Sequence, residues 1–196
     1  PATSLGRQRC CRPSTRKRPA CKACPMIAPA LPAAPTHTLC FLTSGERVLM
    51  LHRRKEPNRG LWNGVGGRIE AGETPHAACL REVREETGLQ LTAASFAGLL
   101  SWCAPAADGA LALYTAPAPS EEVHSCDEGD LRWQPRQWVF SSSAVVSNIH
   151  VFGPAVLNGA PACVYHFDYG SHGHIQSHER RPLPASFRVA QHGANI

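Results

Sequence analysis

The chain has 196 residues and a formal net charge of +5, and 43% of its residues are hydrophobic. This length suffices for one globular domain with tails, and no apolar run approaches the roughly 18–20 residues that a membrane-spanning helix needs. Seven Lys and Arg and no acidic residue lie within residues 1–25, so the rest of the chain carries −2 and the basic character belongs to a tail.

The first segment, residues 1–36, is rich in Pro, Arg, Ala, Cys and Ser and has no periodic apolar pattern, which predicts disorder. Its "CC" pair at Cys10 and its "CKAC" run from Cys21 offer an alternative, a zinc site whose neighbouring arginines contact nucleic acid. Adjacent cysteines make poor tetrahedral ligands, so disorder is the favoured interpretation. Met26 is a candidate true start of the protein, and the composition also fits a weak transit peptide.

Residues 37–185 carry the predicted elements of one domain, followed by a C-terminal tail over residues 186–196. "THTLCFL" and "ERVLML", separated by the turn "TSG", predict two strands. The next passage, "WNGVGGRIEAGE", predicts a glycine-rich loop with a short strand, in which the backbone can approach a ligand closely.

A helix is predicted over "TPHAACLREVREETGL", residues 74–89, because every boundary signal is present. Thr74 suits the N-cap, Pro75 suits the first helical position and Gly88 suits the C-terminal cap. Further strands and helical segments follow, and this order of elements predicts a mixed α/β sandwich. Strands are expected over 89–102, 110–116, 129–135 and, as the last one, 162–170, with helical segments between 136 and 157.

The cysteines favour a reducing compartment. Their odd number, nine, and their scatter through apolar and mixed segments do not fit a disulfide framework. No apolar segment follows the basic start, so no secretory signal is expected. We therefore expect a cytoplasmic protein with reduced thiols.

Three carboxylates lie on one face of the predicted helix. Glu82, Glu85 and Glu86 are spaced i, i+3 and i+4, which makes them neighbours and costs about 0.2–0.5 kcal/mol for a like-charged i,i+4 pair. One interpretation is a solvated acidic surface. The other is a site for Mg²⁺, or alternatively Mn²⁺, because clustered hard oxygen ligands suit ions that bridge to substrate phosphates.

The run from Gly67 to Leu89, "GRIEAGETPHAACLREVREETGL", resembles the signature motif of the Nudix hydrolases, and all nine constrained positions are met. This resemblance implies the Nudix fold, an α/β/α sandwich with a mixed β-sheet between helices. It also implies Mg²⁺-dependent hydrolysis of a nucleoside diphosphate linked to another group. The matching positions are Gly67, Glu73, Arg81, Glu82, Val83, Glu85, Glu86, Gly88 and Leu89.

The resemblance also implies roles for single residues. Glu82, Glu85 and Glu86 correspond to metal ligands, together with the carbonyl oxygen of Gly66. A second implied pair, Glu73 and Arg81, braces the loop against the helix. The group that accepts the proton of the attacking water stays open between Glu86 and Glu128, and Glu128, in "CDEGD", is either an additional metal ligand and base or part of a solvated acidic turn.

The stretch "LWNGVGGRIE" and the segments upstream of it resemble the MutT-like branch that hydrolyses oxidised purine nucleoside triphosphates such as 8-oxo-dGTP. In that branch Asn63 would hydrogen-bond the base, because an amide offers a donor and an acceptor together. Thr38 would line the pocket, Arg53 would lie at its edge, and Asn148 is a candidate second base contact. The implied products are a nucleoside monophosphate and pyrophosphate, and the implied role is sanitation of the nucleotide pool and DNA repair.

Several alternatives stay open at this point. Pro57 stands where the mammalian form of that branch has an aromatic residue, and the aspartate pair of that form has no clear counterpart after Trp138. Pro105 lies sixteen residues after Leu89, a spacing associated with ADP-ribose pyrophosphatases. A nucleotide- or RNA-binding module without turnover is the alternative of another class. Trp62 is either core or pocket wall.

Overall fold

The computed structural model describes residues 34–184 and residue 187. The zinc and nucleic-acid hypotheses for the N-terminal tail lie outside these residues, as does nearly all of each predicted tail. Among the described helices none is both long enough and apolar enough to cross a membrane.

The domain is built on one mixed β-sheet of eight strands, in the order β3-β2-β1-β5-β4-β7-β8, with β6 paired to β2. Strands β1 and β5 are parallel, as are β4 and β7, and the other pairs are antiparallel. The strands are β1 (His37–Ser44), β2 (Arg47–Arg53), β3 (Trp62–Asn63), β4 (Ser95–Cys103), β5 (Gly109–Pro117), β6 (Gly129–Pro135), β7 (Cys163–Tyr169) and β8 (Ile175–Arg181).

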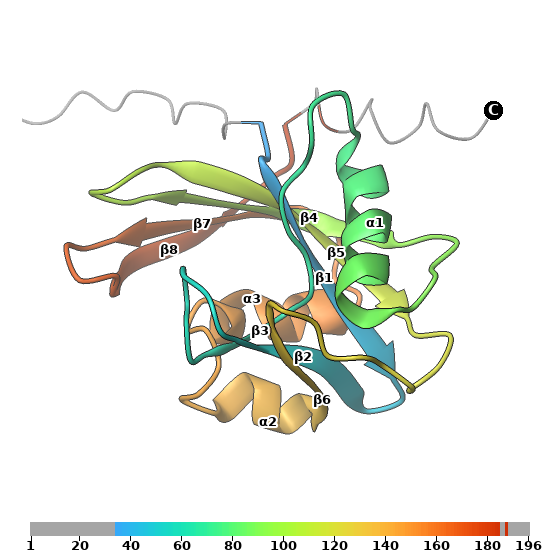
Figure 1. Ribbon diagram of the computed structural model, residues 1–196. Coiled ribbons are helices and arrows are strands. Elements are labelled where there is room, and N and C mark those ends of the chain that lie inside the picture. Colours follow the sequence, from blue (N-terminus) through green and yellow to red (C-terminus); the bar gives the residue numbers. More distant parts are fainter. Residues whose placement is uncertain (1–33, 185–186, 188–196) are drawn as a thin grey trace, which may run out of the picture. The chain divides into compact units, whose positions relative to one another are not determined.

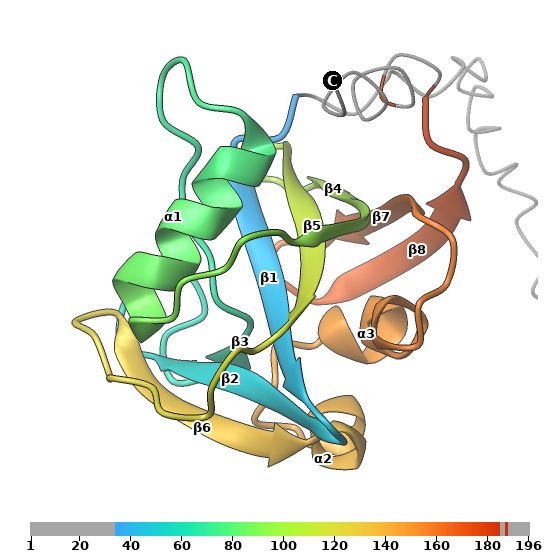
Figure 2. The ribbon, with the colours of Figure 1, turned by 90° about the vertical axis from the view of Figure 1, so that its right-hand side faces the viewer.

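Helices cover both faces of this sheet. Helix α1 (Pro75–Thr87) lies on one face, while α2 (Arg136–Ser141) and α3 (Ile149–Leu157) lie on the other, as Figures 1 and 2 show from two directions. The predicted α/β/α sandwich is therefore confirmed.

Two hydrophobic cores fill the two interfaces, because successive side chains of a strand point to opposite faces. On β1, Cys40 and Leu42 belong to the core beneath α1, whereas Phe41 belongs to the core beneath α3. Phe41 packs against Phe152 of α3 with ring centroids 6.0 Å apart. Strand β1 thus joins both layers and has its start close to the helix that bears the carboxylates.

The boundary signals of α1 operate as predicted. The hydroxyl of Thr74 accepts a hydrogen bond from the Ala77 amide at 3.1 Å, Pro75 opens the helix, and Gly88 ends it with φ of +78°. Because both ends are defined by local chemistry, the three glutamates hold a fixed position on the helix surface.

The predicted elements after α1 agree with the structure except at two places. The strand expected from Leu89 begins only at Ser95. The expectation that 162–170 holds the last strand is wrong, because β8 follows as an antiparallel partner of β7. β8 has the sequence "IQSHERR" with no buried residue, so it lacks the apolar alternation that marks a strand in a sequence.

Candidate functional site

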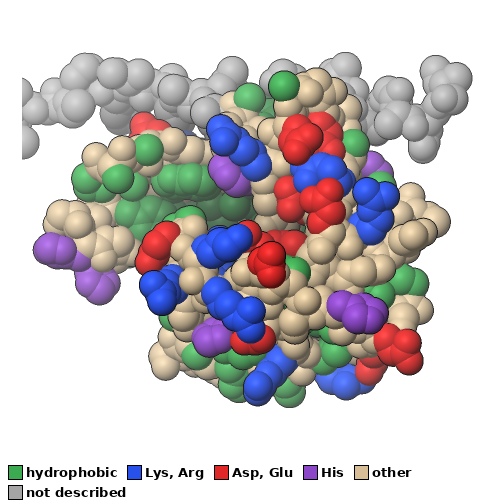
Figure 3. Space-filling view, in the orientation of Figure 1, with side chains coloured by type: hydrophobic (Ala, Val, Ile, Leu, Met, Phe, Trp, Pro, Cys, Tyr) green, Lys and Arg blue, Asp and Glu red, His purple; other side chains and the backbone are tan. Residues whose placement is uncertain are grey.

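A cavity of about 1260 Å³ opens beside α1 and extends toward β4 and the β7–β8 turn. In Figure 3, acidic side chains gather over α1, and a recess with hydrophobic side chains lies beside them. The cavity therefore joins a charged end to an apolar end. The predicted site residues that line it are Thr38, Arg53, Asn63, Gly66, Glu82, Glu85, Glu86, Glu128 and Asn148.

The three carboxylates of α1 differ in their surroundings. Glu85 is half exposed, whereas Glu86 is only 6% exposed and accepts a hydrogen bond from the Gly66 amide at 2.8 Å. Desolvation raises the pKa of Glu86 to about 7, with further repulsion from Glu82 and Glu128. Desolvation also raises the pKa of Glu82. The site thus concentrates negative charge where water stabilises it poorly.

Arg81 organises the charged end. Its guanidinium forms a bidentate pair with Glu73, at 3.0 Å and 2.9 Å, and donates to the Arg68 carbonyl oxygen at 2.9 Å. The same side chain contacts Glu82 at 2.9 Å and Glu85 at 3.0 Å. Through these bonds Arg81 ties the loop before α1 to the helix and orients two carboxylates, and it lowers the pKa of Glu73.

Two glycines allow the loop to lie against β1 and α1. A Cβ on Gly66 would stand 2.4 Å from the Thr38 carbonyl oxygen, and Gly66 has φ of +145°. A Cβ on Gly67 would stand 2.5 Å from the carboxylate of Glu82. The close backbone approach that the glycine-rich stretch predicts is therefore present, and a side chain at either position would displace the site.

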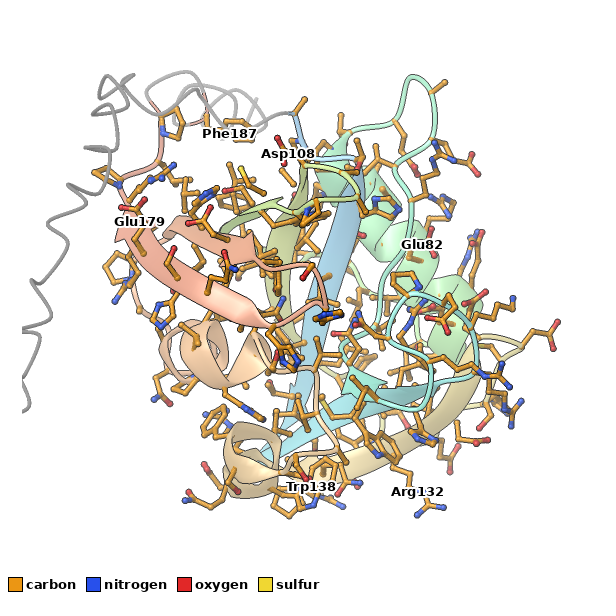
Figure 4. The ribbon with its side chains drawn as sticks, turned by 90° about the vertical axis from the view of Figure 1, so that its left-hand side faces the viewer. Glu82, Asp108, Arg132, Trp138, Glu179 and Phe187 are labelled. Atoms are coloured by element: carbon orange, nitrogen blue, oxygen red, sulfur yellow. The ribbon has the colours of Figure 1, made fainter. Side chains whose placement is uncertain are left out.

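Glu128 lies on the turn before β6. It forms an ion pair with Lys55, whose Nζ is 2.6 Å from Glu128 Oε1. Glu128 lines the same cavity as the α1 carboxylates, of which Glu82 is labelled in Figure 4. The negative charge of Glu128 is close enough to Glu86 to raise the pKa of Glu86. The sequence does not indicate that Lys55 pairs with Glu128, because the two residues are 73 positions apart.

Polar groups also reach the apolar end of the cavity. Asn63 Oδ1 accepts the Gly64 amide at 3.0 Å, and Asn148 Nδ2 donates to the Tyr169 hydroxyl at 3.0 Å, so both amides are held in place. Thr38 is 3% exposed, and its hydroxyl has no hydrogen-bond partner within the described part of the chain. An unpartnered buried hydroxyl beside a cavity is available to a ligand.

Arg53 stands at the edge of this cavity. Its Nε donates to the Pro57 carbonyl oxygen at 2.9 Å, which orients the side chain along the loop after β2. Burial raises the pKa of Glu86, and the positive charge of Arg53 offsets a small part of this rise. Arg53 therefore lies between the charged end and the loop that carries Pro57.

Two aromatic residues of the cavity wall, Trp102 and Tyr169, were not predicted from the sequence. Trp102 on β4 lies flat over Gly109, where a Cβ would stand 2.3 Å from its ring. In the sequence, the position of Trp102 is indicated only by Gly109, the residue that opens the neighbouring strand β5. Trp62, by contrast, stacks on His52 with centroids 4.8 Å apart and meets Trp138 edge-on, which supports core packing rather than a pocket wall.

The chain is similar to known proteins in sequence and in fold. The family model described as NUDIX domain matches residues 34–149. The chain is 31% identical over 102 residues to an uncharacterized Nudix hydrolase, YvcI, of Bacillus subtilis, covering 49% of this chain and 63% of that protein. A crystal structure of a MutT protein from Bacillus halodurans has a TM-score of 0.65 and 25% identity, covering 76% of this chain and 98% of that one.

A further relative bears on the choice of substrate. The chain is 33% identical over 66 residues to the oxidized purine nucleoside triphosphate hydrolase of Mus musculus, covering 34% of this chain and 42% of that protein. The chain thus spans less than two thirds of the length of both curated relatives, at 63% and 42%.

Proposed function

Because the chain belongs to the Nudix hydrolase family, we propose that it hydrolyses nucleoside polyphosphates with the help of Mg²⁺. The preferred substrate is an oxidised purine nucleoside triphosphate such as 8-oxo-dGTP, which is split into the nucleoside monophosphate and pyrophosphate. The observation that carries this proposal is the cavity itself, which combines the carboxylates of α1 with amide and aromatic side chains.

The residues at the charged end fit a divalent cation. The proposed ligands are Glu82, Glu85, Glu86 and, through its carbonyl oxygen, Gly66. Hard oxygen donors of this kind suit Mg²⁺, with Mn²⁺ as an alternative. The buried carboxylate of Glu86, whose neighbours are also acidic, gains most from a cation, since burial disfavours its charged form. The lack of a side chain at Gly67 leaves room for the Glu82 carboxylate.

A bound divalent cation would neutralise phosphate charge and make a water molecule more acidic at neutral pH. The protein's own residues have three other tasks in this proposal. Arg81 holds Glu82 and Glu85 in orientation, and Arg53 presents positive charge beside the triphosphate. Glu86 or Glu128 accepts the proton of the attacking water, and Glu128 is held in place for this by Lys55.

The apolar end would hold the nucleobase. In this proposal Asn63 and Asn148 hydrogen-bond the base edges, the Thr38 hydroxyl supplies a further polar contact, and Trp102 offers a flat apolar surface for stacking. The wall fits a purine better than a sugar or a peptide, because it pairs large apolar surfaces with a few oriented polar groups. The similarity to the mouse relative supports the oxidised purine as the first candidate.

ADP-ribose is the second candidate substrate, because Pro105 lies on the wall of the same cavity. A nucleotide-binding module without turnover is the candidate of another class, and the intact carboxylates Glu82, Glu85 and Glu86 of the signature motif disfavour it. We also keep the cytoplasm as the proposed compartment, since the five cysteines among the described residues are free thiols.

The test is a substrate panel with Mg²⁺: 8-oxo-dGTP, dGTP, ADP-ribose and dinucleoside polyphosphates, scored by kcat/KM and by the identity of the products. We expect the highest kcat/KM with 8-oxo-dGTP and release of pyrophosphate. A higher value with ADP-ribose would instead support the second candidate. Tight nucleotide binding without turnover of any substrate would support the binding module and refute the hydrolase.

A further inference from the structure

A second cluster of metal-ligating side chains lies outside the nucleotide cavity. Cys103 at the end of β4 is paired in register with Asp168 on the parallel strand β7, and His166 lies two residues before Asp168 on the same face. One ligand atom from each of the three lies within 4.8 Å of the others. Trp102 lines the nucleotide cavity, so its neighbour Cys103 points to the opposite face of the sheet.

The spacing of these atoms suits a tetrahedral ion better than a simple hydrogen bond. His166 Nε2 is 3.4 Å from Asp168 Oδ1, longer than an N–H···O bond ordinarily is. Two ligand atoms with metal bonds of about 2.0–2.1 Å at the tetrahedral angle would be about 3.3 Å apart. The Cys103 sulfur lies within 4.8 Å of the other two ligand atoms, so a movement of at most about 1 Å brings it to the ~3.6 Å expected between sulfur and nitrogen.

The outer contacts of the cluster orient its ligands. His166 Nδ1 is 2.9 Å from the hydroxyl of buried Ser101, which leaves Nε2 free to face Asp168 Oδ1. The Ser177 hydroxyl donates to Asp168 Oδ2, which leaves Oδ1 facing Nε2. Hydrogen bonds of this kind to the second atom of each ligand are how proteins fix imidazole and carboxylate ligands around a metal.

The surrounding charge is mixed but favours a cation at the cluster. Asp108 from the β4–β5 loop lies beside Cys103, and Glu179 on β8 is paired in register with His166; both acids are labelled in Figure 4. Arg181 is paired with Glu179 and so offsets one of them. A divalent ion would balance the remaining acids together with the Cys103 thiolate.

We propose that Cys103, His166 and Asp168 form a Zn²⁺ site that joins β4 to β7, separate from the magnesium site on α1. The set of one thiolate, one imidazole and one carboxylate suits Zn²⁺ and not Mg²⁺, which takes oxygen ligands. A water molecule completes the fourth position, because the cluster lies at the solvent-exposed end of its strands.

The test uses the full reduced chain and Co²⁺, whose thiolate-to-metal charge-transfer band reports sulfur ligation. The oxygen ligands on α1 give no such band. We expect the wild-type chain to show this band. Cys103→Ser should lose the band intensity that corresponds to one bound Co²⁺, and added Zn²⁺ should displace that Co²⁺ from the wild-type chain. His166→Gln and Asp168→Asn should weaken Co²⁺ binding at this site, and Ser177→Ala should weaken it roughly tenfold.

The controls separate this cluster from other thiols. Cys163→Ser, on the same strand as the two other ligands, should keep the full band, and so should Glu85→Gln. Any thiolate site in the N-terminal residues would survive in Cys103→Ser, so the quantity compared is the difference between wild type and variant. The proposal is overturned if Cys103→Ser has the wild-type spectrum, or if His166→Gln and Asp168→Asn bind Co²⁺ as tightly as wild type.

Discussion

Glu86 and Asn63 both line the cavity but have different surroundings. Glu86 is buried, bonded to the Gly66 amide and close to like charges, so its environment disfavours the ionised form. Asn63 is held by the Gly64 amide and presents its remaining amide groups to the cavity. In the proposed function, the first residue bears on turnover and the second on substrate choice.

Replacement of either Glu85 or Glu86 by Gln should abolish most turnover. A neutral amide keeps the shape of the side chain but loses the negative charge proposed to bind the cation. We therefore expect kcat/KM to fall by roughly a hundredfold or more, which exceeds the usual loss when a residue that only hydrogen-bonds to a metal ligand is replaced. Circular dichroism should stay unchanged. The control is Glu122→Gln, an exposed carboxylate outside the cavity, which should keep full activity. Near-normal activity in both Glu85→Gln and Glu86→Gln would refute the metal-site assignment.

Asn63→Ala should change substrate preference. Loss of hydrogen bonds to the base should lower kcat/KM for 8-oxo-dGTP by roughly tenfold to a hundredfold, with a much smaller effect on ADP-ribose. Asn158→Ala, at the exposed end of α3, serves as the matched control and should have no effect. Equal losses for both substrates would mean that Asn63 only shapes the loop through its bond to Gly64.

At the scale of elements, the junction between the glycine-rich loop and α1 positions the site. The helix is capped by Thr74 and Gly88, and the loop is attached to it through Glu73 and Arg81. The caps act within one helical turn, whereas the brace joins residues eight positions apart, so the sequence indicates the brace only through the resemblance to the Nudix motif. The mutual orientation of loop and helix then brings the Gly66 amide to Glu86, twenty residues away.

The brace predicts a pH-dependent contribution to stability. Because Arg81 lowers the folded-state pKa of Glu73 below the ordinary 4.5, the stabilisation is present above about pH 4.5 and is lost as the pH falls through the folded-state value. Glu73→Gln should therefore be less stable than wild type at pH 7, and the difference should shrink as the medium is acidified. Urea denaturation at several pH values measures this, and a difference independent of pH would contradict it.

At the scale of the whole molecule, the sheet separates two hydrophobic cores, one beneath α1 and one beneath α3. The core under α3 is continuous through Phe41, Phe152 and Tyr165. The ring centroids of Phe41 and Phe152 are 6.0 Å apart, and those of Phe152 and Tyr165 are 5.8 Å apart. This layer supports the strands that carry the apolar end of the cavity. Its integrity should therefore matter for the stability of the whole domain.

Phe152→Ala tests this layer. Phe152 is fully buried between β1 and β7, so its truncation should lower the free energy of unfolding by about 3–5 kcal/mol. The matched control is Val151→Ala on the adjacent, partly exposed position of α3, which should cost far less. Chemical denaturation of both variants measures the two costs, and similar values would show that the α3 layer is not a packed core.

The sequence by itself determined the class of fold, the helix with its caps, and the grouping of three carboxylates on one helix face, because caps, glycine turns and i,i+3 and i,i+4 spacing are local properties of a chain. It also indicated Thr38, Asn63 and Asn148 through their resemblance to a known branch, and the structure brings all three to one cavity. Their roles toward a substrate stay predictions.

Only the tertiary structure decided which distant residues meet. Trp102 and Tyr169 close the apolar end, Lys55 reaches Glu128, and Cys103 meets the side chains of β7, yet each contact depends on strand register across dozens of residues. Strand β8 escaped prediction because an exposed edge strand buries no side chain and so leaves no apolar pattern. Local chemistry is therefore readable in the chain, whereas contacts made by sheet pairing appear only once the strands are aligned.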